Sequence, residues 1–324
     1  PPRSTLFPYT TLFRSMTSVL LQNLLSPNTS ALLADAGPTG RSLTLAQAAS
    51  DKAAGVFIEP YHSRIDKEAN PLGYDARLWG FSVGYEQYVG DSLLGLHAGW
   101  GQSDIDYSGV GYSANSEDMD VVTAGFSGLT CWDLWTLRYG LTGFYGSHDY
   151  KGLTGASLDE RETASFHSYG TSATVMAGRV LRRGRHIWLP EAGLNWLWSH
   201  RERYVTEATD PAWNTTYSAM NDHDLQAEAA IRWLSTFMHD DLRISPSASL
   251  GIRHLLTDDD TSVTQSVPGA SPVDVKSQRE RTAMTLSGSV TLTKDPCALS
   301  LAYDGEYSPD AQRHNLWLRF SWLF

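Results

Sequence analysis

The chain has 324 residues, a formal net charge of −11 at pH 7 and a hydrophobic content of 41%. No stretch approaches the ~18 consecutive apolar residues of a membrane-spanning helix, which excludes a helical membrane protein but not a transmembrane barrel, whose strands are half polar. The acidic balance and the lack of a long basic run argue against a nucleic-acid partner.

The N-terminal part divides into three segments. Residues 1–15, PPRSTLFPYTTLFRS, resemble a translated sequencing adapter and carry no fold prediction. Residues 16–41 have no basic start and no clear signal-peptide cleavage site, so we expect them to be a linker that follows a missing N-terminal part. Residues 42–54 favour a helix that stops at Gly55. This helix either frays on a surface or plugs a lumen.

From Gly55 onward, segments with a period of two alternate with turn signals, which predicts antiparallel strands with one apolar and one polar face. About twelve strands follow from Val56. Their polar faces consist of small residues with sparse Arg and Glu, unlike the outer face of a soluble sandwich. Small residues suit the inside of a curved, wet barrel, and Trp and Tyr near the segment ends suit interfacial girdles. We therefore predict an all-β transmembrane barrel over residues 55–324, with the N-terminal α-helix in its lumen.

Every second connection is short, and the connections between them are longer. In outer-membrane barrels the short turns lie on the periplasmic side and the long loops outside. By this rule the first strand starts on the same side as Phe324 ends. The expected short turns are Gly90-Asp91, Thr130-Cys131, Arg183-Gly184, His239-Asp240 and Lys294-Asp295.

The last ten residues form an amphipathic strand that ends at the aromatic C-terminus. Such a strand needs a partner for its free edge, and pairing with the first strand near Val56 closes the barrel. Trp317 and Leu323 blur the alternation. The apolar set is Leu316, Leu318, Phe320, Trp322 and Phe324.

Five stretches carry a resemblance to a known family: Gly80-Phe-Ser-Val-Gly-Tyr85, Ser147-His-Asp-Tyr150, Leu189-Pro-Glu-Ala-Gly193, Ser262-Val-Thr-Gln-Ser266 and Leu301-Ala-Tyr-Asp-Gly-Glu-Tyr307. With them, residues 55–324 resemble the autotransporter β-domain, the translocator of type V secretion. The tail departs from the family by ending Trp-Leu-Phe rather than Tyr-Arg-Phe. The Asn-Asn pair at which some members cut themselves is absent, so self-cleavage is not carried over.

The resemblance implies a twelve-stranded barrel in the bacterial outer membrane, a helix through its pore and a passenger N-terminal to that helix. Residues 16–41 would then be the residual passenger or linker. It implies as partners the outer-membrane lipids and lipopolysaccharide, the barrel insertion machinery, periplasmic chaperones and the chain's own passenger. The insertion machinery would recognise the apolar set of the last strand. The rival functions are a porin-like or adhesion barrel and, further off, an outer-membrane hydrolase.

Charged residues on the polar faces are the candidate functional residues. They either pair with one another and hold the barrel's shape, or they grip the helix of residues 42–54. By parity the inward-facing set is Glu228, Arg232, Arg253, Asp304, Glu306 and Arg319.

Signals for catalysis are weak, and we expect no enzyme, cofactor or metal. The G-x-S-x-G match around Ser82 lies inside a period-two strand, whereas a nucleophile elbow needs a strand-to-helix turn. Asp222-His223-Asp224 and Asp258-Asp259-Asp260 are expected to form a solvated rim, and no spacing suggests a zinc site. Cys131 and Cys297 lie far apart in strand order, which predicts two free thiols.

Overall fold

The structure is a computed structural model that describes residues 54–68, 73–108, 114–153, 161–257, 260–266, 271–278 and 281–324. Residues 1–15, 16–41 and almost all of the predicted helix over 42–54 lie outside this part. The exception is Ala54, which already belongs to the first strand. Within the described part, the only helical element is the short 3-10 helix η2 (Pro211–Trp213).

The rest of the described chain is mainly strand. The strands are β1 (Ala54–Lys67), β2 (Gly73–Val89), β3 (Ser92–Ser108), β4 (Ser116–Trp132), β5 (Trp135–Leu153), β6 (Arg161–Arg179), β7 (Leu181–Arg183), β8 (His186–Arg201), β9 (Tyr204–Val205), β10 (Glu207–Ala208), β11 (Thr216–Tyr217), β12 (Met220–Ser235), β13 (Phe237–His239), β14 (Leu242–Leu255), β15 (Asp260–Ser266), β16 (Val273–Gln278), β17 (Thr282–Lys294), β18 (Cys297–Tyr307) and β19 (Ala311–Leu323).

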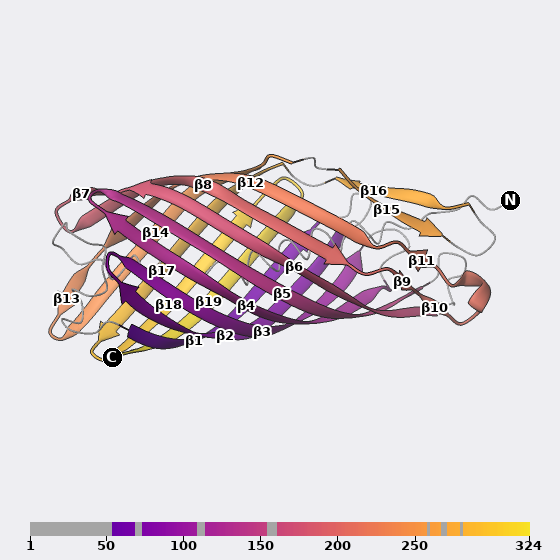
Figure 1. The fold of residues 1–324 in the computed structure, drawn as a ribbon, viewed down its shortest axis with the longest axis horizontal. Helices are drawn as coiled ribbons and strands as arrows, with labels where there is room; N and C mark the ends of the chain where they lie inside the picture. The colour runs from indigo at the N-terminus through magenta and orange to yellow at the C-terminus, as the bar shows by residue number, and fades with distance from the viewer. Residues whose placement is uncertain are drawn as a thin grey trace.

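Twelve of these strands form a closed antiparallel barrel, as predicted. Their order around it is β1, β2, β3, β4, β5, β6, β8, β12, β14, β17, β18 and β19, and β19 pairs with β1 to complete the ring. The short β7 and β13 extend β6 and β12 at one end. Figure 1 shows the strands crossing the barrel obliquely, as closure of a sheet requires.

The two ends of the barrel differ. Five two-residue turns lie at one end, which we call the turn end, together with the C-terminus (Figure 1). Four of these turns contain a residue with a left-handed backbone: Gly90, Asp133, Gly184 and Asp240. The expected turn at Thr130-Cys131 was misplaced, because β4 continues to Trp132 and pairs it with Trp135.

The opposite end, the loop end, carries the long connections. There β9, β11, β15 and β16 form a separate four-stranded sheet, and β10 pairs with β6 (Figure 1). The barrel strands reach 19 residues in β5 and β6. A tilted membrane strand needs only about 9–11 residues, so the barrel extends well beyond a bilayer at one end.

The seam between the first and last strands is paired along its length except at Glu59 and Pro60. Ala54 and Phe324 exchange two backbone hydrogen bonds, with Phe324 N donating to Ala54 O at 2.9 Å and Ala54 N donating to Phe324 O at 3.2 Å. Val56 lies opposite Trp322, and Ile58 lies opposite Phe320. The predicted closure near Val56 is confirmed, and the barrel has no free edge.

The predicted faces are also confirmed. Along the middle of the strands most large apolar side chains point outward and are exposed, for example Leu250 and Ile252 on β14, while the small and polar ones point inward. Inward apolar side chains gather in two clusters nearer the ends. Toward the loop end the outward side chains become charged, as where Leu141 and Tyr145 on β5 give way to Asp149. The apolar band therefore starts at the turn end and stops short of the loop end.

Two aromatics near strand ends do not lie in the interfacial girdles that the sequence suggested for Trp and Tyr. Trp317 is 4% exposed and points inward, and Tyr88 packs inside against an apolar cluster at the turn end. Both occupy positions of their strands that face inward. Strand alternation therefore determines where they point, although Trp and Tyr as residue types favour the membrane interface. No helix in the described part of the chain is long and apolar enough to span a membrane.

Candidate functional site

The inside of the barrel is layered. Near the turn end, an apolar cluster of Leu93, Leu129, Ile187, Leu189 and Leu234 lines the inner wall. Near the loop end, a larger cluster gathers aromatic side chains such as Tyr107, Phe166 and Tyr217. Between these clusters the inward positions of β8 and β12 change to charged and amide side chains. All six charged residues predicted from parity lie on inward positions of their strands.

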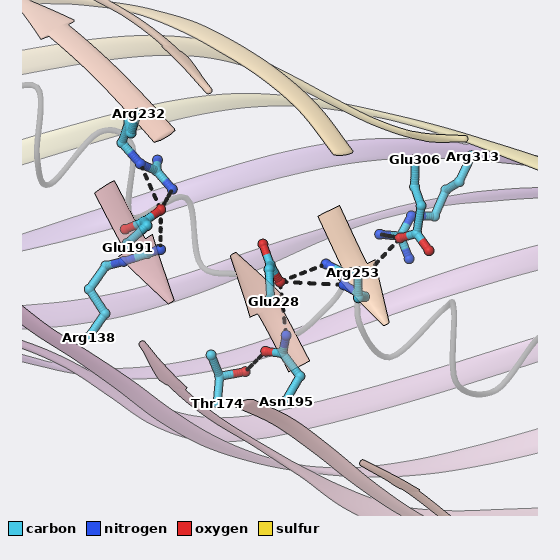
Figure 2. Close-up of polar contacts among 9 residues, drawn as sticks. All are labelled: Arg138, Thr174, Glu191, Asn195, Glu228, Arg232, Arg253, Glu306 and Arg313. Carbon is cyan, nitrogen blue, oxygen red and sulfur yellow. Dashed lines mark hydrogen bonds and ion pairs between the residues drawn. The ribbon is translucent and has the colours of Figure 1, made fainter. Parts of the chain in front are cut away.

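The first charged group centres on Glu191 of β8. Its Oε1 lies 2.9 Å from Arg138 Nη2 and 3.0 Å from Arg232 Nη2, and its side chain is 2% exposed. Figure 2 shows the two guanidinium groups converging on this one carboxylate from β5 and β12. A buried carboxylate with two charge-assisted partners is well satisfied, so this group ties three strands together.

The second group runs across the wall toward the seam. Arg253 of β14 lies between Glu228 and Glu306, with its Nη2 3.2 Å from Glu228 Oε2 (Figure 2). Arg313 of β19 also reaches Glu306, with 2.6 Å between its Nη2 and Oε2. On its way to Glu306, Arg253 passes the strand β17, which presents the small residue Ala283 opposite it. A larger inward side chain there would block this contact.

Amide and hydroxyl groups continue this row on the other side. Asn195 Nδ2 donates to Glu228 Oε2 at 2.9 Å, and Thr174 Oγ1 donates to Asn195 Oδ1 at 2.8 Å (Figure 2). The connected row, which we call the polar ladder, joins β6, β8, β12, β14, β18 and β19. Its members are Thr174, Asn195, Glu228, Arg253, Glu306 and Arg313.

A third group lies at the seam. Arg319 of β19 places its Nη2 2.6 Å from Glu86 Oε1 and its Nη1 4.0 Å from Glu59 Oε2. Its guanidinium also lies over the ring of Phe57, 3.8 Å from the centroid, which is a cation–π contact. Asp304 faces inward on β18 opposite Ser287 of β17. The structure therefore brings Glu228, Arg253 and Glu306 into contact and places Arg232 and Arg319 in two other groups.

Sequence reasoning missed several members of these groups: Glu59, Glu86, Arg138, Glu191 and Arg313. Each has the inward parity of its strand, and that parity was the signal that could have found them. What parity does not give is the pairing, because the partners lie on strands far apart in the sequence. In these groups, with Asp304, five arginines (138, 232, 253, 313, 319) lie beside six carboxylates (59, 86, 191, 228, 304, 306), so most of the charge within them is compensated locally.

One buried group has the order of a Ser-His-acid triad. His148 Nε2 lies 2.8 Å from Ser168 Oγ, and His148 Nδ1 lies 2.6 Å from Glu117 Oε1. The other carboxylate oxygen, Glu117 Oε2, accepts a hydrogen bond from the Tyr107 hydroxyl at 2.7 Å. However, Ser168 is 1% exposed, and the His148 ring is stacked on Phe166 at 4.7 Å. A nucleophile needs an open approach for its substrate. We therefore assign this group to packing of the loop end.

The other chemical candidates give no site. Ser82 lies in the middle of β2, opposite Glu59 and Gly99, and not in a strand-to-helix turn. Asp222 and Asp224 were wrongly expected on a solvated rim, since both are buried and face inward while His223 faces outward. Asp258 and Asp259 lie outside the described residues. Among the described residues, no group of three or more His, Cys, Asp or Glu could hold a metal ion, and Cys131 and Cys297 are free thiols.

Comparisons with known proteins agree with this architecture. The translocator domain of the autotransporter NalP from Neisseria meningitidis has a TM-score of 0.73 with 13% identity, covering 97% of this chain and 98% of that one. The beta domain of the Bordetella autotransporter BrkA has a TM-score of 0.57 with 13% identity, covering 84% of this chain and 100% of that one. The transport unit of the autotransporter AIDA-I from Escherichia coli has a TM-score of 0.57 with 10% identity, covering 85% of this chain and 91% of that one.

At these identities the likeness shows the shared fold. No curated protein matches the chain by sequence. The family model of the autotransporter beta-domain matches residues 56–304, which is most of the chain and nearly the whole barrel. The chain therefore belongs to the autotransporter beta-domain family and is an outer-membrane translocator barrel.

Proposed function

We propose that this barrel conveys a passenger joined to its N-terminal side across the outer membrane, and that the chain preceding Ala54 runs through the lumen. The observation that carries the proposal is the position of Ala54, which is bonded to Phe324 at the turn end. Short turns face the periplasm in outer-membrane barrels. A passenger outside the cell can then be joined to β1 only through the lumen. The barrel in this proposal is a conduit without catalysis of its own.

The inward charges supply a wall for that segment. A helix over residues 42–54 would be about 20 Å long, enough to pass the charged layer. Its Asp51 and Lys52 would meet cations and carboxylates in the lumen. We propose that the predicted residues hold this helix in addition to pairing with their neighbours: Glu228, Arg232, Arg253, Asp304, Glu306 and Arg319.

Single-channel conductance in planar bilayers tests the plug. The full chain should conduct poorly, and deletion of residues 16–53 should raise the conductance severalfold, because the helix would no longer fill the lumen. The deletion keeps Ala54 and its hydrogen bonds to Phe324 at the seam. Deletion of residues 1–15 alone is the matched control and should leave the conductance unchanged. Equal conductance with and without residues 16–53 would contradict the proposal.

The outward side chains of the last strand are proposed as the signal for the insertion machinery. Leu316, Leu318, Phe320, Trp322 and Phe324 are all exposed on the outer surface of β19 and its end, where an inserting protein can reach them. Deletion of Phe324 should abolish assembly in the outer membrane, measured by heat-modifiable migration of membrane fractions. Phe324→Trp keeps the aromatic end and should assemble. Normal assembly after deletion would argue against this signal.

The outward apolar surface also suggests partners in the membrane and in the periplasm. Outer-membrane lipids and lipopolysaccharide would contact the outward face, and periplasmic chaperones would hold the unfolded chain before insertion. The apolar band of the outer surface supports both, because an unfolded chain exposes it to water before insertion.

A further inference from the structure

One turn differs in charge from the other four at the turn end. The turns at 90–91, 133–134, 240–241 and 295–296 each contain aspartate, whereas the turn between β7 and β8 reads Arg182-Arg183-Gly184-Arg185. Gly184 has a φ of +60°, which lets the chain reverse within two residues, so that Arg183 and Arg185 lie at the tip of the hairpin. Arg179 is the last residue of β6, shortly before this turn. In a chain with a net charge of −11, this is a local reversal of sign.

These arginines lie on the outer surface among exposed apolar side chains. Arg179, Arg183 and Arg185 are exposed, while Arg182 has the inward parity. The guanidinium of Arg179 is 6.0 Å from the centroid of the Trp135 ring, and that of Arg185 is 4.6 Å from the centroid of Phe237. Trp and Arg at this level of a barrel mark the boundary between lipid headgroups and acyl chains.

The protein does not neutralise these three cations. In the described part of the chain, no carboxylate lies within ion-pair distance of Arg179, Arg183 or Arg185. Two outward arginines at the loop end are different: Arg64 and Arg77 both pair with Asp75. Unpaired guanidinium groups beside exposed aromatics leave their forked N–H groups available to an anion from the membrane.

We propose that Arg179, Arg183 and Arg185 form a basic surface that binds the phosphodiester headgroups of anionic glycerophospholipids in the periplasmic leaflet. We call these three residues the basic patch. Leu181 and Trp188 are exposed beside it and lie opposite each other in the β7–β8 pair, so they offer an apolar surface to the acyl chains of those lipids. Each guanidinium near a membrane surface adds roughly a fivefold preference for an anionic lipid.

The occupant follows from depth and charge. The basic patch is at the turn end, where the periplasmic leaflet supplies glycerophospholipids. Its exposed apolar neighbours favour a ligand that has acyl chains over one that is fully water-soluble. A zwitterionic lipid offers a phosphate but also carries a cation that the arginines repel. The site should therefore prefer phosphatidylglycerol to phosphatidylethanolamine.

Native mass spectrometry of the full chain, folded in detergent micelles, tests this preference. The probes are phosphatidylglycerol and phosphatidylethanolamine at equal concentration. The variant Arg179→Gln/Arg183→Gln/Arg185→Gln should lose about tenfold or more of its affinity for phosphatidylglycerol and little for phosphatidylethanolamine. The matched control, Arg64→Gln/Arg77→Gln, removes two outward arginines at the loop end and should bind both lipids like the wild type. Heat-modifiable migration checks that each variant is folded.

Equal phosphatidylglycerol affinity in the wild type and the patch variant would overturn the proposal. If that variant nevertheless assembled slowly in cells, the basic patch would serve a protein of the insertion machinery instead. A second measurement does not depend on variants. Raising the salt concentration should weaken binding of phosphatidylglycerol by the wild type but not of phosphatidylethanolamine. Salt-independent binding would also overturn the proposal.

Discussion

The ion pairs inside the barrel and those on its outer surface at the loop end use similar side chains at similar distances, but their surroundings differ. Inside, Arg138 and Arg232 meet Glu191, whose side chain is 2% exposed. Outside, Arg64 and Arg77 meet Asp75 with the arginines 49% and 58% exposed. The contact geometry is much the same in both places. Water screens the outer pairs and is largely excluded from the inner ones.

This difference determines what each set contributes. A buried pair adds little net stability when intact, but losing one partner leaves a charge without compensation in a poorly hydrated place. An exposed pair can lose either partner to water at almost no penalty. The inner charges should therefore fix the shape and contents of the lumen, whereas the outer ones should serve mainly for solvation.

The largest effect is expected from Glu191→Gln. The substitution removes the carboxylate that Arg138 and Arg232 share and leaves both buried cations without it. It should therefore lower the free energy of unfolding by about 3–5 kcal/mol. Urea unfolding in vesicles, followed by tryptophan fluorescence, measures the change. Glu202→Gln is the matched control, since Glu202 makes an exposed contact with His167 on the outside. A loss no larger than that of the control would break the comparison.

A smaller effect is expected from a charge on the lipid-facing side. Leu141→Arg places a cation among the outward apolar residues of β5, between Trp135 and Tyr145, and should cost about 2–4 kcal/mol. Ser287→Arg is the control, because its side chain enters the lumen beside Asp304. Unfolding of both variants in the same vesicles measures the difference. Similar losses would contradict the assignment of the two faces.

The inner wall should tolerate little added volume where a glycine lies close against its neighbours. A Cβ on Gly170 would meet the Trp198 carbonyl oxygen and the Phe144 ring, so Gly170→Ala should destabilise by about 1–3 kcal/mol. A Cβ on Gly140 would find its nearest neighbour at 3.5 Å, and Gly140→Ala should be close to neutral. Unfolding midpoints in urea compare the two. An equal response at both glycines would mean that the wall is not packed as described.

The smallest effect is expected from the outer pairs. Asp75→Asn should change the unfolding midpoint hardly at all, and the change should be smaller still at high salt.

A pH effect is expected from Asp66. Partial burial raises the pKa of Asp66, but hydrogen bonding and the charge of Arg64 outweigh it and lower that pKa below its usual value. The contribution of Asp66 is therefore present at neutral pH and disappears as the pH falls through the lowered pKa. Unfolding of Asp66→Asn against the wild type across acidic pH checks the sign.

The sequence alone was sufficient for the class of fold and for the faces of the strands. Alternation such as Ile244, Pro246, Ala248, Leu250 and Ile252 against serines and arginines is a local property of one strand, so it survives without knowledge of any partner. The same parity placed Glu228, Arg253 and Arg319 inside. Residue type was a poorer guide than parity, since Trp317 and Tyr88 point inward although tryptophan and tyrosine favour membrane interfaces.

Only the tertiary structure decided which charges meet. Arg253 and Glu306 are 53 residues apart, and their contact depends on the register of β14, β17 and β18 and on the small Ala283 between them. Asp222 and Asp224 likewise became buried because the barrel wall extends beyond the apolar band at the loop end. Strand identity and facing follow from short-range patterns, whereas ion pairing, burial and closure depend on long-range register around the ring. That is why the sequence predicted a barrel with charges in its lumen but not the polar ladder that those charges form.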